Sequence, residues 1–567
     1  MSDVRSKETS KETKAARIER LKAEKNPWEC LEEILRFAKH GHEAIPREWL
    51  ETYFRWWGIY TQGDGRGVFG HATPYFMVRI RIPNGLLTAH QVRAIAELAE
   101  RYARGFADIT VRQNIQLHWV RIEDMPDVLF RLFRVGLTTM GACGDDTRNV
   151  TGCPLAGIDG DEVCDASPLV LQATRLLVGN DAFYNLPRKF KICITGCRVW
   201  CSYPEINDVG LTALERMRAD GQREIGFSVR VGGGLSTAPH FGVRLNAFVR
   251  WSQVLPVVRG IAEIFRDSDV LRQDRAKARL KFLFLEHGWT AERFQEELER
   301  RLGFRLDSAV EEEPPDHVYR DHVGVHPQKQ EGYYYAGFAI LRGRITAEQM
   351  RRVADLADHY GDGQVRTTNM QNIVLLNIPE AKVGAFLREV EGTDLRLDAS
   401  PFWRGAIACT GTEFCKLAIA ETKSFARWLV EELERRLPGF AEPLKINVNG
   451  CPNSCGQHWI ADIGLQGCKM KIEGEHVDAF DILLGGAVGR GATFTRRIGL
   501  KVPAARVPDV LERLLREYVS RRRPGERFHE FCWRHSEAEL RAMLMAKDTE
   551  AMEAPPWPGS PPHGVEG

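Results

Sequence analysis

Several features that would assign a protein to a class are absent from this 567-residue sequence. No apolar run approaches the roughly 18 residues that a membrane-spanning helix needs. The segment 1–25 is charged throughout and lacks the apolar centre of a signal peptide. We therefore expect a cytoplasmic protein that has no membrane partner.

An excess of charge is absent as well. Lys and Arg number 78 and Asp and Glu 77, which leaves a net charge of +1. Nucleic-acid binders usually carry a strong basic excess, so we expect no nucleic-acid partner. The glycine runs VGGGLS and LLGGAVGRG lack the G-x-G-x-x-G pattern between a strand and a helix. The sequence therefore predicts no domain for a flavin or a nicotinamide dinucleotide.

Cysteine is too scarce for a disulfide scaffold, with 13 in the chain. In a reducing compartment such cysteines are metal ligands, catalytic thiols or small buried apolar groups. Eleven of them gather in two places. The first half contains Cys143, Cys153, Cys164, Cys193, Cys197 and Cys201, and the second half contains Cys409, Cys415, Cys451, Cys455 and Cys468.

Two stretches of the sequence are repeated. At an offset of 258 residues, IPNGLLTAHQVRAIAELAERYARG resembles LRGRITAEQMRRVADLADHYGDG. Each copy follows an alternating apolar run, offers Thr88 or Thr346 as the N-cap of an amphipathic helix, and precedes a second strand. At an offset of 254, KFKICITGCRVWCSYPEINDVGL resembles LKINVNGCPNSCGQHWIADIGL. The sequence therefore predicts two pseudo-equivalent halves, each with a small α+β unit followed by a larger one.

The cysteines of the second half have a distinctive spacing. Cys409 and Cys415 are separated by five residues, and after a gap of 35 residues Cys451 and Cys455 are separated by three. Four thiolates from two strand-to-helix loops suit a four-iron cluster, because each iron takes one soft ligand. Structural zinc sites usually show two CxxC-like knuckles, and neither spacing fits them. Four buried structural cysteines are the remaining alternative, which their pairing within a repeated unit disfavours.

The motifs CTGTEFC and NGCPNSC resemble those of the siroheme- and cluster-containing nitrite and sulfite reductases. The likeness runs from about Trp56 to Phe531 and includes HVGVHPQKQEGYY, PLAGID, LPRKFK and VGGGLS. The resemblance implies a six-electron reductase that holds siroheme and a 4Fe–4S cluster on Cys409, Cys415, Cys451 and Cys455. It also implies that Cys455 bridges the two groups, and that ferredoxin or a similar protein supplies the electrons.

The resemblance implies an α+β fold with pseudo-two-fold symmetry. It contains two ferredoxin-like half-domains and two larger α/β domains that bind the siroheme and the cluster. We expect a helical arm at 1–70, ferredoxin-like half-domains at 71–140 and 323–400, a siroheme and substrate domain at 141–322, a 4Fe–4S and siroheme domain at 401–540, and a tail at 541–567.

The resemblance assigns the family's substrate cations to Arg79, Arg148, Lys189 and Lys191. Lys189 and Lys191 share one face of an extended segment, so two ammonium groups can converge on one anion. Taken alone, each residue has a simpler interpretation as a solvated surface base. Arg79 argues against that interpretation, because its strand is otherwise core-like and its repeat counterpart is Gly337.

Siroheme carries eight carboxylates, so its binding site must supply further positive charge. Four basic residues alternate along DRAKARLKF, although a basic helix face would look similar. The candidate siroheme contacts are Arg112, Asn114, Arg275, Lys277, Arg279 and Lys281.

The cysteines of the first half raise the possibility of a second cluster site. Cys197 and Cys201 align with Cys451 and Cys455 in the repeat. The partner pair is missing, however, because the matching stretch NVTGCPLAGID contains Cys153 alone. The pattern therefore favours a vestige of the duplication over a second cluster.

Three positions bear on the choice between sulfite and nitrite. The nitrite branch of the family typically has Asn where this sequence has Lys191, and an extra cation suits the doubly charged sulfite. Tyr60 and Cys143 resemble the sulfite branch, in which such a pair can be cross-linked beside the haem. HVGVHPQKQEGY and TRNVTGCPLAGID instead resemble nitrite reductases. We expect reduction of sulfite to sulfide, with reduction of nitrite to ammonia as the alternative.

Overall fold

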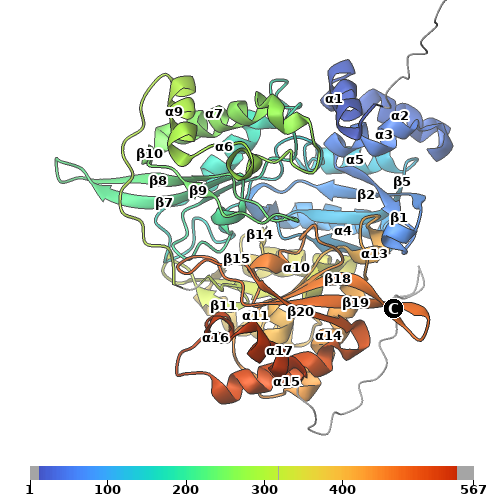
Figure 1. Cartoon of the computed structure of the whole chain (residues 1–567), viewed down its shortest axis with the longest axis vertical. Coiled ribbons are helices and arrows are strands. Elements are labelled where there is room, and N and C mark those ends of the chain that lie inside the picture. Colours follow the sequence, from blue (N-terminus) through green and yellow to red (C-terminus); the bar gives the residue numbers. More distant parts are fainter. Residues whose placement is uncertain (1–11, 317, 546–567) are drawn as a thin grey trace, which may run out of the picture.

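The computed structural model describes residues 12–316 and 318–545. The expected tail at 541–567 therefore falls almost entirely outside the described residues, as does the beginning of the arm at 1–70. Four five-stranded sheets form the framework, and they divide into two small and two large α+β units (Figure 1). Among the described residues, no helix is both long and apolar enough to cross a bilayer.

The chain begins with an arm of three helices that packs beside the first small unit. These helices are α1 (Lys14–Glu24), α2 (Leu31–His40) and α3 (Arg47–Glu51). Tyr53 anchors the arm by donating from its hydroxyl to the Leu21 carbonyl at 2.8 Å. The arm reaches the larger unit as well, because the Lys22 ammonium donates to the Leu186 carbonyl at 2.9 Å.

The two small units have the same topology and exchange one strand each. The first sheet has the order β1-β2-β5-β4-β13 and the second has the order β11-β12-β15-β14-β3. Thus β3 of the first half completes the second sheet and β13 of the second half completes the first. The bounds are β1 (Ile59–Gly63), β2 (Ala72–Ile80), β3 (Leu86–Thr88), β4 (Phe106–Ile109), β5 (Ile115–Arg121), β11 (Gly324–Pro327), β12 (Tyr333–Phe338), β13 (Arg344–Thr346), β14 (Gln364–Thr367) and β15 (Ile373–Pro379).

The sequence predicted strand–helix–strand in each small unit and missed β1, β3, β4, β11, β13 and β14. These strands have only three to five residues, too few to show an alternating pattern. The exchanged strands also obtain their hydrogen bonds from the other half of the chain, as Leu87 opposite Val365 illustrates. Local sequence therefore carries little signal for them.

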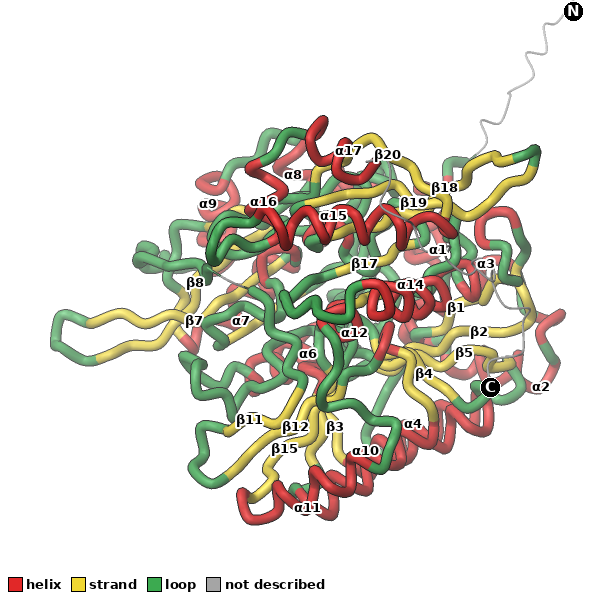
Figure 2. Tube along the Cα trace, turned by 90° about the horizontal axis from the view of Figure 1, so that it is seen from below, coloured by secondary structure: helices red, strands yellow, loops and turns green. Residues whose placement is uncertain are grey.

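The helices of the small units begin where the sequence predicted. Thr88 and Thr346 each accept from the backbone N–H three residues on and complete a capping box with Gln91 or Gln349. These caps precede α4 (Ala89–Tyr102) and α10 (Ala347–Tyr360), which pack against each other and lie side by side in Figure 2. The small units also contain α5 (Met125–Arg134) and α11 (Glu380–Glu391). One continuous apolar core fills both units.

The larger unit of the first half contains the sheet β10-β8-β7-β6, with β9 paired to β8. Its β7–β8 hairpin extends from the body of the molecule (Figures 1 and 2). Helices pack against this sheet around a separate core. The bounds are β6 (Ile192–Thr195), β7 (Val209–Met217), β8 (Arg223–Val231), β9 (Val243–Arg244), β10 (Val249–Arg250), α6 (Ser167–Leu177), α7 (Val254–Arg266), α8 (Phe282–Leu285) and α9 (Ala291–Leu302).

The larger unit of the second half contains the sheet β16-β17-β18-β19-β20. As in the first half, a parallel pair leads into a long antiparallel hairpin, here β18–β19. The bounds are β16 (Ala406–Ala408), β17 (Ile446–Asn449), β18 (Ile463–Ile472), β19 (Glu475–Leu484), β20 (Arg496–Pro503), α12 (Pro401–Gly405), α13 (Gly411–Phe414), α14 (Lys423–Arg436), α15 (Val507–Arg521), α16 (Phe528–Arg534) and α17 (Glu537–Met545).

Candidate functional site

The four signature cysteines lie at one edge of the last sheet. Cys409 follows β16 and Cys451 follows β17, and these two strands are parallel neighbours. Their carboxyl ends therefore meet, so the two loops that carry the cysteines lie together. Cys415 and Cys455 lie further along the same two loops. This arrangement is what four thiolates on one cluster require.

Backbone and side-chain N–H groups already point at three of these sulfurs. Gly450 donates to the Cys409 Sγ at 3.3 Å, Leu417 to the Cys415 Sγ at 3.4 Å, and the Asn453 amide to the Cys451 Sγ at 3.4 Å. Donors of this kind stabilise sulfur ligands of a metal group.

Gly450 leaves no room for a side chain beside these sulfurs. A Cβ at this position would lie 2.6 Å from the Ala420 carbonyl oxygen. The close approach of the two loops therefore requires glycine here, as the loop glycines in the sequence suggested.

Cys455 differs from the other three cysteines. It is exposed, whereas Cys409, Cys415 and Cys451 are buried or partly buried. Burial raises the pKa of the Cys409 and Cys415 thiols to about 12, and after burial the charge of Cys455 is the next cause in both cases. Cys455 therefore stands close to the other thiols while it also faces open space.

A pair of lysines from the first half lies near the cluster loops, and Lys189 is the one on which the charge of Cys455 acts. Lys189 and Lys191 flank the buried Phe190 just before β6, so both point away from the core. Burial and then the charge of Arg279 lower the pKa of Lys189 to about 7, while the charge of Cys455 acts on it in the opposite direction. Residues from the two halves thus meet at one place.

Lys191 shares this environment. Burial, followed by Lys189, Arg112 and Arg279, lowers the pKa of Lys191 well below its ordinary value. Its backbone N–H donates to the Asp208 carboxylate at 2.8 Å. The repeat reproduces this bond in the second half, where Lys445 donates to Asp462 at 2.8 Å.

Arg79, Tyr60 and Cys143 form a second group in the first half. The Arg79 guanidinium donates to the Gln116 side-chain oxygen at 2.8 and 3.1 Å and to the Cys143 Sγ at 3.1 Å. Its Cζ atom lies 5.9 Å from the centre of the Tyr60 ring. Arg79 therefore connects the two residues that the sequence singled out as a pair.

Arg148 links this group to the lysines. Its backbone N–H donates to the Phe190 carbonyl at 2.7 Å, between Lys189 and Lys191. Its side chain lines one pocket with Tyr60, Arg188 and Arg275. The structure thus gathers the substrate cations predicted from the sequence on one side of the first half.

The predicted siroheme contacts do not all lie beside the two lysines. Arg112 and Arg279 act on Lys191, and Arg279 forms a bidentate pair with Asp208 at 2.7 and 3.1 Å. Arg275 belongs to the pocket of Arg148. Lys281 donates instead to backbone carbonyls, among them Leu235 at 2.7 Å.

Lys277 and Asn114 have partners outside this group. Lys277 is exposed and forms an ion pair with Glu286 at 2.8 Å. Asn114 accepts from the Ile82 N–H at 3.1 Å, as its repeat counterpart Asn372 accepts from Ile340 at 2.9 Å. The basic segment 275–281 is a loop, because α8 begins only at Phe282, so it is not the basic helix that the sequence left open.

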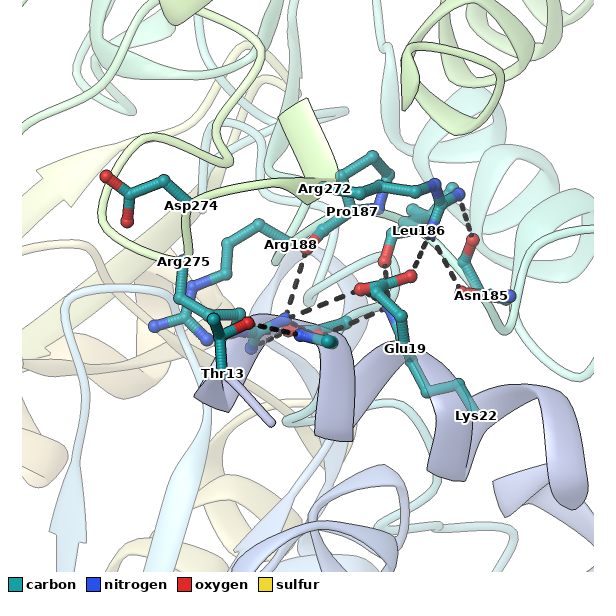
Figure 3. A network of polar contacts seen from close by, with 12 residues as sticks. Thr13, Glu19, Lys22, Asn185, Leu186, Pro187, Arg188, Arg272, Asp274 and Arg275 are labelled. Atoms are coloured by element: carbon teal, nitrogen blue, oxygen red, sulfur yellow. Dashed lines mark hydrogen bonds and ion pairs between the residues drawn. The ribbon is translucent and has the colours of Figure 1, made fainter. Parts of the chain in front are cut away.

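Sequence reasoning missed the acidic residues that hold these cations. Asp145 is buried and pairs with Arg275, Arg188 at 3.5 Å and Lys22 at 3.6 Å. The adjacent basic segment also binds α1, because Arg272 pairs with Glu19 at 2.6 Å, and Figure 3 shows Arg272 and Arg275 facing this helix. Asp208 could have been found, since it recurs as Asp462 in the repeat.

We predict that Asp145→Asn destabilises the protein by about 3–5 kcal/mol at neutral pH, because it leaves buried cations without a counter-charge. Although burial alone would raise it, Arg275 and Lys22 hold the pKa of Asp145 below its ordinary value. Its stabilising effect is therefore present above about pH 4 and is lost at lower pH. Urea unfolding should show the gap between variant and wild type closing as the pH falls below 4; a gap that is independent of pH would contradict this prediction.

Comparison with known proteins decides the family. The model of the nitrite and sulphite reductase 4Fe–4S domain matches residues 143–306 and 400–551. The model of the nitrite/sulfite reductase ferredoxin-like half domain matches residues 70–132 and 326–392. The chain belongs to the nitrite and sulfite reductase family.

Similar members of the family carry both names. An assimilatory ferredoxin-dependent nitrite reductase of Haloferax mediterranei is 39% identical over 531 residues, or 88% of each chain. A sulfite reductase [ferredoxin] of Mycobacterium tuberculosis is 38% identical over 541 residues, or 92% of this chain and 95% of the relative. The structure of the Mycobacterium tuberculosis NirA protein matches with a TM-score of 0.87 at 38% identity, over 92% of this chain and 97% of that one.

Membership of this reductase family confirms the predicted fold, with its repeated ferredoxin-like half-domains, and the predicted siroheme and 4Fe–4S cofactors. The side chains fit such cofactors. Within the described residues, neither the Lys189 nor the Lys191 side-chain nitrogen has a hydrogen-bond acceptor, and both side chains are half-buried. Burial and neighbouring cations lower the pKa of both amines, so their charged forms are costly unless an anionic group occupies the space beside them.

The two halves of this reductase have diverged at the position of Arg79. Its repeat counterpart is Gly337, where a Cβ would lie 1.6 Å from the His322 carbonyl oxygen. The segment that connects the halves therefore occupies the space that the Arg79 side chain fills in the first half. This explains why the second half has no side chain equivalent to that of Arg79.

Proposed function

We propose that this protein is a ferredoxin-dependent sulfite reductase that reduces sulfite to sulfide with six electrons. The observation that carries the proposal is that Lys189, on the segment of the first half that also carries Lys191, lies close enough to the cluster loops of the second half for the charge of Cys455 to act on it. Siroheme bound there would supply the iron that holds the substrate, beside a cluster that supplies the electrons. In the proposal the cofactor is surrounded by Arg112, Asn114, Arg275, Arg279 and Lys281. Lys277 lies at its periphery.

The basic side chains have two tasks in this reaction. Sulfite is largely a dianion near neutral pH, and Arg79, Arg148, Lys189 and Lys191 offset the cost of taking it out of water. Each oxygen that leaves as water also consumes two protons. Lys189, with a pKa of about 7 set by burial and by Arg279, can donate a proton near neutral pH.

The preference for sulfite rests on Lys191. Burial and nearby cations lower the pKa of Lys191, and a bound anion raises it again by favouring the charged form. The second ammonium that forms beside Lys189 then gains more from a dianion than from a monoanion, because the attraction scales with the product of the charges. Tyr60 and Cys143, both in contact with Arg79, add the resemblance to the sulfite branch. Reduction of nitrite to ammonia is the second candidate, supported by the motifs TRNVTGCPLAGID and HVGVHPQKQEGY and by relatives that are named nitrite reductases.

Steady-state kinetics with reduced ferredoxin as the donor test this proposal. We expect kcat/KM to be higher for sulfite than for nitrite, with measurable turnover of both anions. A higher kcat/KM for nitrite would make the protein a nitrite reductase. Absence of turnover with either anion, in protein that contains both cofactors, would contradict the reductase assignment itself.

A further inference from the structure

Three buried thiols of the first half lie close together, away from the cluster loops. The Sγ atoms of Cys153, Cys197 and Cys201 all lie within 4.8 Å of one another, and those of Cys153 and Cys201 are 3.6 Å apart. Each residue is at most 3% exposed. The sequence pattern favoured a vestige of the duplication, because nothing in the sequence shows that these three cysteines lie together.

The duplication explains how the chain brings them together. Cys197 and Cys201 follow β6 as Cys451 and Cys455 follow β17. Thr151 pairs in parallel with Cys193 of β6, so the segment that leads to Cys153 runs beside β6 as β16 runs beside β17. Cys193 itself is not part of the group, because its Sγ contacts the Ser202 hydroxyl at 3.1 Å.

The distances fit one ion and not a cluster. Zinc binds thiolates at about 2.3 Å, which places two sulfurs of a tetrahedral site about 3.8 Å apart. The thiolates of a four-iron cluster each bind a different iron and must stand farther apart. In the part of the chain that the structure describes, no three of the signature thiols come within the 4.8 Å that encloses Cys153, Cys197 and Cys201.

The surroundings also suit thiolates bound to a metal ion. The Leu155 N–H donates to the Cys153 Sγ at 3.4 Å. An apolar shell excludes water, and it contains Leu155, Ile158, Tyr335, Val374 and Leu376. The charge of Arg320, which also pairs with Asp159 at 2.6 Å, acts on Cys153 and Cys197 and balances the extra negative charge of three thiolates.

A fourth donor is available on the segment that connects the halves. His322 is 4% exposed, and within the described residues neither of its ring nitrogens has a partner. It lies two residues after Arg320. Its ring nitrogens stand outside the group of ligand atoms that lie within 4.8 Å of one another, so the side chain must turn toward the three sulfurs to complete a site. Its backbone is in the left-handed region, with φ of 62°, so the connector turns at this residue.

We infer that Cys153, Cys197 and Cys201 bind a single Zn²⁺ ion, and that His322 turns toward them to become the fourth ligand. Three cysteines and one histidine form a closed structural site. The site ties the loop at Cys153 and the loop after β6 to the connector that leads into β11. It therefore stabilises the junction between the two halves and takes no part in the reduction of the substrate.

Metal analysis of the purified holoprotein, from cells grown with added Zn²⁺, tests this inference. We expect about one zinc per chain in the wild type. Cys201→Ser and Cys153→Ser should lose the zinc and keep the iron and acid-labile sulfide of the wild type. Cys164→Ser, a nearby partly buried cysteine outside the group, serves as the matched control and should retain the zinc.

A second measurement serves if the serine variants fail to fold. Wild-type protein produced with Co²⁺ in place of Zn²⁺ should show the near-ultraviolet charge-transfer absorption of cobalt bound to thiolates. A wild type with neither bound zinc nor this absorption would overturn the inference. Loss of cluster iron in Cys201→Ser would reveal a second iron–sulfur cluster instead, and a Cys153–Cys201 disulfide found by mass spectrometry would also exclude the zinc site.

Discussion

Cys455→Ser is expected to abolish reductase activity, with a loss on the order of a thousandfold or more, which corresponds to roughly 4 kcal/mol or more of barrier height. The serine hydroxyl is a poor ligand for a soft metal centre, and Cys455 is the signature thiol that faces both the other cysteines and Lys189. Since cofactors that act as a unit fail together, partial activity is not expected.

Two measurements check the prediction for Cys455→Ser. Turnover with reduced ferredoxin should disappear, and the visible spectrum should lose the signature of coupled siroheme and cluster. Cys468→Ser is the matched control, because Cys468 lies on β18 of the same sheet but outside the signature. A Cys455→Ser protein that keeps coupled cofactors and full turnover would remove Cys455 from its assigned role.

Lys191→Asn is expected to lower kcat/KM for sulfite about a hundredfold or more. Loss of one cation from a site that stabilises charge costs about 2–4 kcal/mol of transition-state stabilisation. Nitrite should lose less, because a monoanion gains less from each cation. The measurement is kcat/KM for both anions, with the same ferredoxin, in variant and wild type.

The repeat supplies the control for this variant. Lys445 occupies the equivalent position in the second half and makes the same backbone bond to its aspartate. Lys445→Asn should therefore leave the ratio of the two kcat/KM values unchanged. Equal losses for both anions in Lys191→Asn would remove the main support for sulfite, and a larger loss for nitrite would favour a nitrite reductase.

The features that the sequence predicted well depend on residues close together in the sequence. Thr88 and Thr346 mark the N-termini of their helices, because the capping box is contained within four residues. The spacing of Cys409, Cys415, Cys451 and Cys455 is equally local to two loops, and it pointed to the cluster before the fold was known. The internal repeat also predicted that the chain divides into two equivalent halves.

The features that the sequence did not predict depend on contacts between distant segments. The exchange of β3 and β13 is decided by pairing with the other half, as Ile345 opposite Ala107 shows. Asp145 forms ion pairs with three cations from separate parts of the chain. The residues next to it in the sequence do not indicate these partners. Lys277 and Arg279 look alike in an alternating basic run, yet one is at the surface and the other is buried.

We expect one four-iron cluster in the second half of the chain, together with one siroheme. The iron content of the purified wild-type holoprotein, measured with its acid-labile sulfide, tests this directly. The expected result is the four irons of a single cluster plus the one iron of siroheme, with four sulfides per chain. A content that requires two clusters, or that leaves out either the cluster or the siroheme iron, would contradict it.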